Sequence, residues 1–210
     1  MPEEEARIIV IYGFLGSGKT TVMLHLAKCI TASGKRAAIV VNEAGKVPVD
    51  GKLLSMAGLP VKEIFAGCVC CSVVGDFVAT LAALGGSGEF SCILVEPSGM
   101  ADAPRLFESL LRHGSFPLRK ILILDGVRLA LLMKVARPLM EGQMREADII
   151  LLNKNDAGGG KDEAGTHALI EQCAHHAPVY PVSALLGIPD DLIKEIFNGI
   201  LDVFGKVESE

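Results

Sequence analysis

The sequence predicts a three-layer α/β domain with a mostly parallel central β-sheet, and two observations lead to this fold class. Short apolar runs recur along the 210 residues, and most of them lack the alternation of a strand that faces water on one side. Helix-compatible segments lie between these runs. Strands that alternate with helices are typical of a parallel sheet covered on both faces, which binds ligands at the carboxyl ends of its strands.

Each expected strand coincides with one apolar run. In chain order the runs are RIIVIYGF, AAIVVNE, VKEIF, SCILVEPS, RKILILDG, ADIILLNK and PVYPVSA. They cover residues 7–14, 37–43, 61–65, 91–98, 119–126, 147–154 and 178–184.

The expected helices cover residues 18–33, 75–84, 104–113, 162–176 and 189–204. Gly-rich pieces at 85–88 and 157–165 indicate surface loops that are too short to link domains. With 50% apolar residues the chain can build one sizeable core. We therefore expect residues 1–210 to form one domain, with no second C-terminal domain.

Composition excludes several classes of partner. The formal net charge is −5 and the Lys and Arg residues are scattered, which argues against nucleic acid. Mean hydropathy is +0.43, yet no apolar run approaches the ~20 residues of a membrane-spanning helix, so we expect no membrane partner. The N-terminal MPEEEARIIV is acidic where a signal or transit peptide is basic. We therefore expect a cytoplasmic protein.

Residues 13–20, GFLGSGKT, match the phosphate-binding pattern G-x-x-x-x-G-K-[ST] between an expected strand and an expected helix. Glycines at such a turn let backbone amides approach phosphate oxygens closely. Lys19 would neutralise the β- and γ-phosphates, and the Thr20 hydroxyl would ligate Mg²⁺. The expected fold is therefore that of P-loop nucleoside triphosphatases, with phosphate-binding residues Gly13, Gly16, Ser17, Gly18, Lys19, Thr20 and Thr21.

Residues 153–156, NKND, follow an expected strand and match N-K-x-D, the guanine signature of GTPases. The Asp156 carboxylate can accept hydrogen bonds from both the N1–H and the 2-amino group of guanine, whereas adenine offers no such pair of donors. Taken alone, a polar turn after a strand is commonplace. Together with the phosphate loop it indicates a GTP or GDP site, with base-binding residues Asn153, Lys154, Asp156, Ser183 and Ala184.

Two further segments offer acids to Mg²⁺ and to the γ-phosphate. EPSG, residues 96–99, ends an expected strand, so Glu96 is a candidate to hold Mg²⁺ through water and Gly99 to contact the γ-phosphate. The segment VNEAGKVPVD at 41–50 adds Glu43 and Asp50 near the same ion. Asp50 is the best candidate to orient the attacking water. The expected catalytic set is thus Lys19, Asp50 and Glu96, and the Mg²⁺ set is Thr20, Asp50 and Glu96; the alternative is a group of acids in solvated turns.

Cys68, Cys70 and Cys71 lie within four positions in a chain of six cysteines. A disulfide, a metal site and a nucleophile are all compatible with such a cluster. A reducing compartment and the adjacency of Cys70 and Cys71 disfavour the disulfide, whereas thiolates select soft and borderline divalent ions. On an extended strand Cys68 and Cys70 would point the same way and Cys71 the other way, so three ligands is an upper count.

The other cysteines carry less information. Cys29, on an expected helix, and Cys92, in an expected strand, are predicted to be small core residues. Cys173, His175 and His176 have metal-capable atoms, but successive helix positions face different directions. We do not expect them to form a metal site.

Together these motifs resemble the nucleotide domain of the CobW-like GTPases, relatives of the HypB and UreG metallochaperones. The resemblance runs from about residue 7 to about residue 186, carried by GFLGSGKTT, VVNEAGKVPVDGKLL, GCVCC, EPSG, Gln143 with ADIILLNKND, and VSA. It implies a GTPase that couples nucleotide binding to the holding and delivery of Zn²⁺, Co²⁺ or another transition metal. The implied ligands are Cys68, Cys70 and Cys71, with Glu43 as a further candidate.

Two departures from the family pattern bear on function. The chain reads NEAGK at 42–46 where the family has N-E-F-G-E, so Lys46 replaces a second acid and Ala44 an aromatic residue. Many family members also continue into a second domain, and this chain ends soon after the helix expected at 189–204. Recognition of a client metalloprotein is therefore expected to use the GTPase domain itself or a separate subunit, and a homodimer stays open.

The expected function is a Mg²⁺-dependent GTPase that acts as a metal chaperone or metallocofactor-assembly factor. No arginine finger is recognisable, and because a supplied finger accelerates hydrolysis by ~10³–10⁵, unaided turnover should be slow. One alternative keeps the GTPase and has it gate the insertion or reactivation of a corrinoid on a partner enzyme. An alternative of another class is a small-molecule kinase, which would leave GCVCC at 67–71 unexplained.

Overall fold

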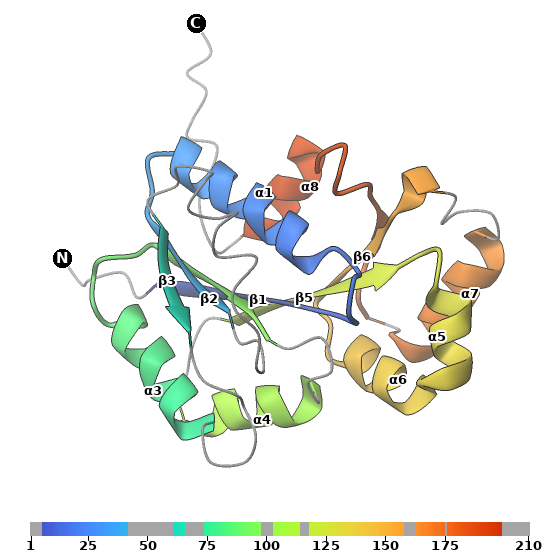
Figure 1. Ribbon diagram of the computed structural model, residues 1–210, viewed down its shortest axis with the longest axis horizontal. Coiled ribbons are helices and arrows are strands. Elements are labelled where there is room, and N and C mark those ends of the chain that lie inside the picture. Colours follow the sequence, from blue (N-terminus) through green and yellow to red (C-terminus); the bar gives the residue numbers. More distant parts are fainter. Residues whose placement is uncertain are drawn as a thin grey trace, which may run out of the picture.

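Seven parallel strands form the centre of the described part of the molecule (Figure 1). The computed structural model describes residues 6–41, 61–65, 74–97, 103–113, 118–157, 163–174 and 176–198. The strands are β1 (Arg7–Tyr12), β2 (Ala37–Val41), β3 (Val61–Phe65), β4 (Cys92–Glu96), β5 (Leu118–Asp125), β6 (Ile149–Asn153) and β7 (Val179–Pro181). Their order across the sheet is β3-β2-β4-β1-β5-β6-β7, and all neighbouring pairs are parallel.

Helices cover both faces of this sheet (Figure 1). One face carries α1 (Lys19–Ala32) and α8 (Asp190–Phe197). The other carries α3 (Val74–Gly85), α4 (Ala103–His113), α5 (Leu129–Val135), α6 (Arg137–Arg145) and α7 (Glu163–Cys173). The predicted three-layer α/β fold with a parallel sheet is confirmed.

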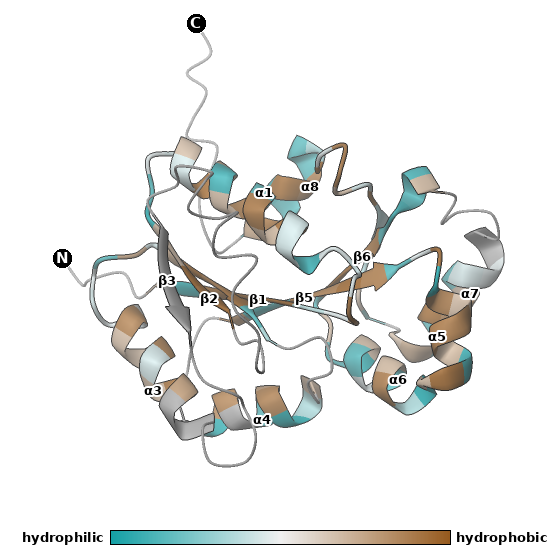
Figure 2. Cartoon of the chain, in the orientation of Figure 1, coloured by the Kyte–Doolittle hydropathy of each residue, from teal (hydrophilic) through white to brown (hydrophobic). Residues whose placement is uncertain are grey.

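Two hydrophobic clusters fill the two spaces between sheet and helices. One joins alternate strand residues such as Ile8 and Val10 to α3, α4, α5, α6 and α7. The other joins the intervening residues, such as Ile9 and Ile11, to α1 and α8. Figure 2 shows hydrophobic residues along the centre of the sheet. β1, β2, β4 and β6 are buried on both faces, which explains why their sequences lack alternation.

Within the described residues, the structure differs most from the sequence prediction at two segments. Residues 127–146, where no element was expected, form α5 and α6 with only Ala136 between them. Pro138 lies in the first turn of α6, where a missing backbone N–H costs least. The helix expected to run on to residue 204 ends at Phe197, because Asn198 leaves the helical region with ψ of 126°. No helix in the described ranges is long and apolar enough to cross a membrane.

The carboxyl ends of the strands meet at one edge of the sheet. Val41 pairs with both Phe65 and Glu96, so the ends of β3, β2 and β4 lie side by side. On the other side of β1, Asp125 pairs with Asn153, which places the ends of β5 and β6 together. β2 and β3, which precede the segment with Glu43 and Asp50 and the cysteine segment in the sequence, are therefore neighbours.

Candidate nucleotide-binding site

The phosphate loop connects β1 to α1, as its sequence pattern predicts. Gly13 and Gly18 have φ of 145° and 102°, a region that favours glycine. A Cβ at Gly13 would lie 2.2 Å from the Ile123 carbonyl oxygen, and a Cβ at Gly18 would lie 2.3 Å from Asn153 Nδ2. The loop is thus seated against β5 and β6, and both positions require glycine. The predicted phosphate-binding set, Gly13, Gly16, Ser17, Gly18, Lys19, Thr20 and Thr21, lies in this loop and the first turn of α1.

Lys19 and Thr20 begin α1 and face the end of β4. Thr20 Oγ1 donates a hydrogen bond to Glu96 Oε2 at 3.0 Å, and Lys19 Nζ lies 3.8 Å from Glu96 Oε1. Lys19 Nζ also donates to the Phe14 carbonyl oxygen at 3.4 Å. The structure therefore brings Lys19, Thr20 and Glu96 together at a helix N-terminus, where the helix dipole favours anions.

These groups suit a nucleotide with its cation. Mg²⁺ takes oxygen ligands, and the Thr20 hydroxyl and Glu96 carboxylate supply them within hydrogen-bonding distance of each other. Ser17 Oγ is buried and has no hydrogen-bond partner among the described residues. An unsatisfied buried hydroxyl is costly, and it lies in the loop that would surround the phosphates.

Asn153 links the two ends of the site. Its Nδ2 donates to the Ser17 carbonyl oxygen at 2.8 Å, and its Oδ1 accepts from the Ala184 backbone N–H at 2.9 Å. The side chain is buried at the end of β6. One amide thus connects the phosphate loop, the NKND motif and the segment after β7.

The predicted base-binding residues also come together. Ser183 Oγ donates to Asp156 Oδ1 at 2.5 Å, and Asp156 is exposed, so its carboxylate is accessible to a base. Lys154 has φ of 67°, the only positive value for a non-glycine residue in the described part of the chain. This turn sends the Lys154 side chain back to β5, where its Nζ donates to Asp125 Oδ2 at 2.7 Å.

Asp125 is a site residue that the sequence analysis did not single out. Its side chain is fully buried at the end of β5 and accepts from Arg128 Nε at 2.6 Å as well as from Lys154. Burial raises the pKa of Asp125, but hydrogen bonds from Lys154 and Arg128 outweigh burial and lower it below its ordinary value. The available sequence signal was an acid at the carboxyl end of an expected strand, next to the strand that carries NKND.

Arg128 is a second residue of this site that was not expected from the sequence. Its Nη2 donates to the Leu15 carbonyl oxygen of the phosphate loop at 2.8 Å, and a Cβ at Gly16 would lie 3.1 Å from that nitrogen. The sequence analysis found no arginine finger. The structure places an arginine on the loop backbone, with its guanidinium already bound to Asp125 and Leu15.

Six predicted site residues lie outside the described residues: Glu43, Asp50, Cys68, Cys70, Cys71 and Gly99. The strands that lead into them are described, and they end side by side at Val41, Phe65 and Glu96. Within the described ranges, no group of three or more His, Cys, Asp or Glu side chains could hold a metal ion.

The described cysteines behave as packing residues. Cys92 is buried in β4, and burial raises the pKa of its thiol to about 12. Cys29 packs against the α1–α8 cluster, and burial also raises its pKa. The prediction of a small core residue is confirmed for Cys92, whereas Cys29 is half-buried at the margin of the core.

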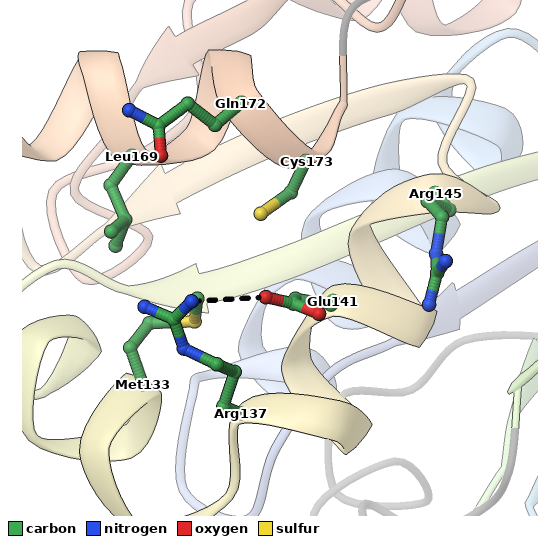
Figure 3. A pocket seen from close by; sticks show the side chains of 7 residues that line it. All are labelled: Met133, Arg137, Glu141, Arg145, Leu169, Gln172 and Cys173. Atoms are coloured by element: carbon green, nitrogen blue, oxygen red, sulfur yellow. Dashed lines mark hydrogen bonds and ion pairs between the residues drawn. The ribbon is translucent and has the colours of Figure 1, made fainter.

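A hollow of about 370 Å³ lies between α5, α6 and α7, on the face of the sheet opposite α1 and α8 (Figure 3). Arg137, Glu141 and Arg145 of α6 face Cys173 of α7 across it, and Arg137 pairs with Glu141 at 3.4 Å. Burial and then Glu141 raise the pKa of Cys173, so the thiol is not activated. This hollow shares no lining residue with the nucleotide site.

Comparison with known proteins agrees with this geometry. Residues 7–181 match the family model described as CobW/HypB/UreG, nucleotide-binding domain. The chain is 30% identical over 188 residues to the zinc chaperone YjiA of Escherichia coli K12, a match that covers 84% of this chain and 57% of the relative. It is 38% identical over 154 residues to the zinc chaperone YeiR of that organism, covering 71% and 47%. The chain spans about half the length of the curated relatives it matches.

Two solved structures support the fold. HypB of Archaeoglobus fulgidus superposes with a TM-score of 0.65 at 17% identity, covering 95% of this chain and 92% of that one. The Zn(II)-bound YjiA GTPase of E. coli superposes with a TM-score of 0.64 at 22% identity, covering 94% and 63%. At these identities the likeness concerns the fold, which is the one that the sequence predicts.

Proposed function

Because the chain belongs to the CobW/HypB/UreG family of nucleotide-binding domains, we propose that it binds and hydrolyses GTP with Mg²⁺ and uses the nucleotide to control the holding and delivery of a divalent metal ion. The observation that carries this proposal is the Asn153 side chain, which bonds the phosphate loop on one side and the segment after β7 on the other. Phosphate-binding and base-binding elements are thereby held in one preformed site.

Guanine recognition is assigned to Asp156. Its exposed carboxylate would accept the N1–H and 2-amino hydrogens of guanine, and the backbone of Ser183 and Ala184 would close over the base. Adenine lacks this pair of donors. A site built around such hydrogen bonds rejects an analogue without them by ~10⁴–10⁵.

Hydrolysis is assigned to the group at the start of α1. Water attacks the γ-phosphorus and forms a new P–O bond while the bond to the β–γ bridging oxygen breaks. GDP leaves with that oxygen, both water protons go to the inorganic phosphate, and one of them then passes to solvent. Lys19 and the loop amides would bind the phosphate oxygens, Thr20 and Glu96 would hold the cation, and Asp50 would orient the water. Bound Mg²⁺ would offset the negative charge of the β- and γ-oxygens. Without a supplied arginine we propose that turnover is slow.

The metal cargo is assigned to the cysteine cluster. Zn²⁺ or Co²⁺ would bind thiolates of Cys68, Cys70 and Cys71, with Glu43 completing a tetrahedral site. Two findings support this assignment. The strands that lead into the two segments, β2 and β3, are neighbours, and the curated relatives YjiA and YeiR are zinc chaperones.

The metal would be delivered to a client metalloprotein in the cytoplasm, and a second copy of the chain is a further candidate partner. Lys46, which stands where the family pattern has an acid, favours a second candidate function. In that function the GTPase gates corrinoid insertion or reactivation on a partner enzyme, and the cysteines need not hold an ion.

Titration of the chain, free of Zn²⁺ and Co²⁺, with GTP and ATP in the presence of Mg²⁺ tests the nucleotide assignment. Wild type should bind GTP far more tightly than ATP. Asp156→Asn should shift preference toward xanthosine triphosphate, because the new amide donates to the 2-oxo group. Asp148→Asn is the matched control: Asp148 binds the Lys120 backbone N–H at the opposite edge of the sheet. Equal wild-type affinity for GTP and ATP would contradict the proposal.

A further inference from the structure

We infer that Arg128 and Asp125 are positioning residues for the nucleotide: Arg128 turns the Leu15–Gly16 peptide so that the Gly16 N–H faces the phosphates, and Asp125 holds Arg128 and Lys154 in place. The inference rests on the proposed function, because it assumes that this loop binds a guanine nucleotide. It goes beyond that function by naming the residues that orient the backbone of the phosphate loop.

Arg128 is fixed at two points of its guanidinium. Nε donates to Asp125 Oδ2 at 2.6 Å, and Nη2 donates to the Leu15 carbonyl oxygen at 2.8 Å. A planar guanidinium that is bound at two of its three nitrogens has one orientation. Because the side chain is 40% exposed, these hydrogen bonds rather than close packing determine where it lies.

The bond to Leu15 determines the direction of the next amide. In a planar trans peptide the carbonyl and the following N–H point in opposite directions, and the described residues contain no cis peptide bond. With the Leu15 carbonyl held toward Arg128, the Gly16 N–H points to the other side of the loop. Phosphate loops bind their β- and γ-phosphates through such backbone amides, so Arg128 orients a donor that the nucleotide needs.

Asp125 extends this control to the base. The same carboxylate oxygen that binds Arg128 accepts from Lys154 Nζ at 2.7 Å, and Lys154 belongs to the NKND motif beside Asn153. Two further bonds, from the backbone N–H groups of Val127 and Arg128 at 3.1 Å, fix the carboxylate itself. Loss of its charge would leave two cations facing each other and release both ends of the site.

Substitutions of Arg128 and of Asp125 are therefore expected to change nucleotide affinity in different ways. Arg128→Ala should weaken binding of GDP and GTP by roughly tenfold or more, the usual effect of losing a hydrogen bond to a charged group, and should leave guanosine affinity unchanged. Arg128→Lys should rescue little, because one ammonium does not span both acceptors. Asp125→Asn should weaken guanosine as well as GDP.

The experiment is a fluorescence titration with N-methylanthraniloyl-GDP, followed by competition with GDP and with guanosine. Arg36→Ala is the matched control for Arg128, because Arg36 forms a 2.7 Å ion pair with Glu89 beside the amino-terminal end of β2. A second readout is the amide proton shift of Gly16, which should move on GDP addition in wild type and much less in Arg128→Ala.

The outcomes distinguish failure of the inference about Arg128 and Asp125 from failure of the proposed function. If wild type binds GDP and Arg128→Ala keeps the wild-type ratio of GDP to guanosine affinity, the inference is wrong while the proposed function stands. If wild type binds no guanine nucleotide, the proposed function fails and the inference fails with it. Should Asp125→Asn not fold, the two Arg128 variants still decide the question, because their side chain is partly exposed.

Discussion

At the scale of single residues, two buried polar side chains connect the sheet to its loops. Asp125 and Asn153 end neighbouring strands and are paired in register. Buried polar groups are costly unless they are hydrogen-bonded, and both find their partners in segments distant along the chain. The need to satisfy these groups is what positions the loops, so the rigid sheet determines where the nucleotide-binding backbone lies.

Asn153→Ala should lower both stability and GTP affinity. It removes the partner of the Ser17 carbonyl and of the Ala184 N–H, and each buried group left unsatisfied costs about 1–3 kcal/mol. The free energy of unfolding can be measured by urea denaturation and GTP affinity by titration. Asn155→Ala, at an exposed position two residues on, should change neither; similar losses in both variants would contradict the role of Asn153.

Asp125 should contribute stability that depends on pH. Its folded-state pKa lies below the ordinary value of 3.8 because Lys154 and Arg128 outweigh its burial. The carboxylate therefore stabilises the fold fully above its unfolded pKa, and this stabilisation is lost as the pH falls through the folded value. The difference in free energy of unfolding between wild type and Asp125→Asn should be constant at about pH 5–7 and shrink below 3.8. A difference that grows on acidification would refute the assignment.

Motif residues could be predicted from the sequence, whereas their supports could not. GFLGSGKT and NKND specify a local backbone and a local chemistry, so Lys19, Thr20, Asn153 and Asp156 could be assigned without knowing any contact. The role of Arg128 exists only because β5 lies beside β1 and β6. No spacing within its own segment shows that arrangement.

At the scale of elements, most strands and helices follow from hydrophobic runs. β1, β2, β4 and β6 were predictable because an uninterrupted apolar run of this length suits a strand buried on both faces. The α5–α6 pair was missed because Pro138 and the short helices break the usual periodicity. The end of α8 was misplaced because IFNGILDVF remains apolar beyond Phe197, and an apolar run does not show where the backbone leaves the helix.

α8 should be part of the core rather than an appendage. Ile196 is fully buried in the cluster between the sheet and α1, so Ile196→Ala should lower the free energy of unfolding by about 2–5 kcal/mol. Lys194→Ala on the exposed side of the same helix should cost at most about 1 kcal/mol, the worth of a surface ion pair. Equal, small effects of the two variants in thermal or urea denaturation would show that α8 does not contribute to the core.

At the scale of the whole molecule, the strand order brings different functions to one edge. From β3 to β6 the ends lead, in turn, into the cysteine segment, the segment with Glu43 and Asp50, Glu96, the phosphate loop, the Asp125–Arg128 pair and the NKND motif. The strand ends that lead into these segments are therefore neighbours through the sheet, although they are distant in sequence.

Metal affinity should depend on the bound nucleotide. We expect Zn²⁺ or Co²⁺ affinity to differ between the GTP-analogue and GDP states by ~1–3 kcal/mol, and linkage requires the same factor in nucleotide affinity. Cobalt gives a direct readout, since thiolate ligation produces charge-transfer absorption. Anaerobic titration of wild type and Cys68→Ser/Cys70→Ser/Cys71→Ser compares the two states. Absorption retained in the triple variant would contradict ligation by these cysteines. Equal wild-type metal affinity with GDP, GTP analogue and no nucleotide would contradict metal coupling and favour the corrinoid alternative.

The pairing of Val41 with both Phe65 and Glu96 also determines the distance over which charges at the ends of β3 and β4 would interact. Two strand spacings amount to ~10 Å, close to the screening length of about 8 Å in physiological salt. At this separation salt would screen much of the field of a divalent charge at the end of β3, but the remaining part would reach Glu96 even if no atom of the sheet moved. The electrostatic part of the coupling between metal and nucleotide affinity should weaken as ionic strength rises, whereas a part that arises from a change of loop geometry should persist. Measuring the coupling at several salt concentrations would therefore separate the two contributions.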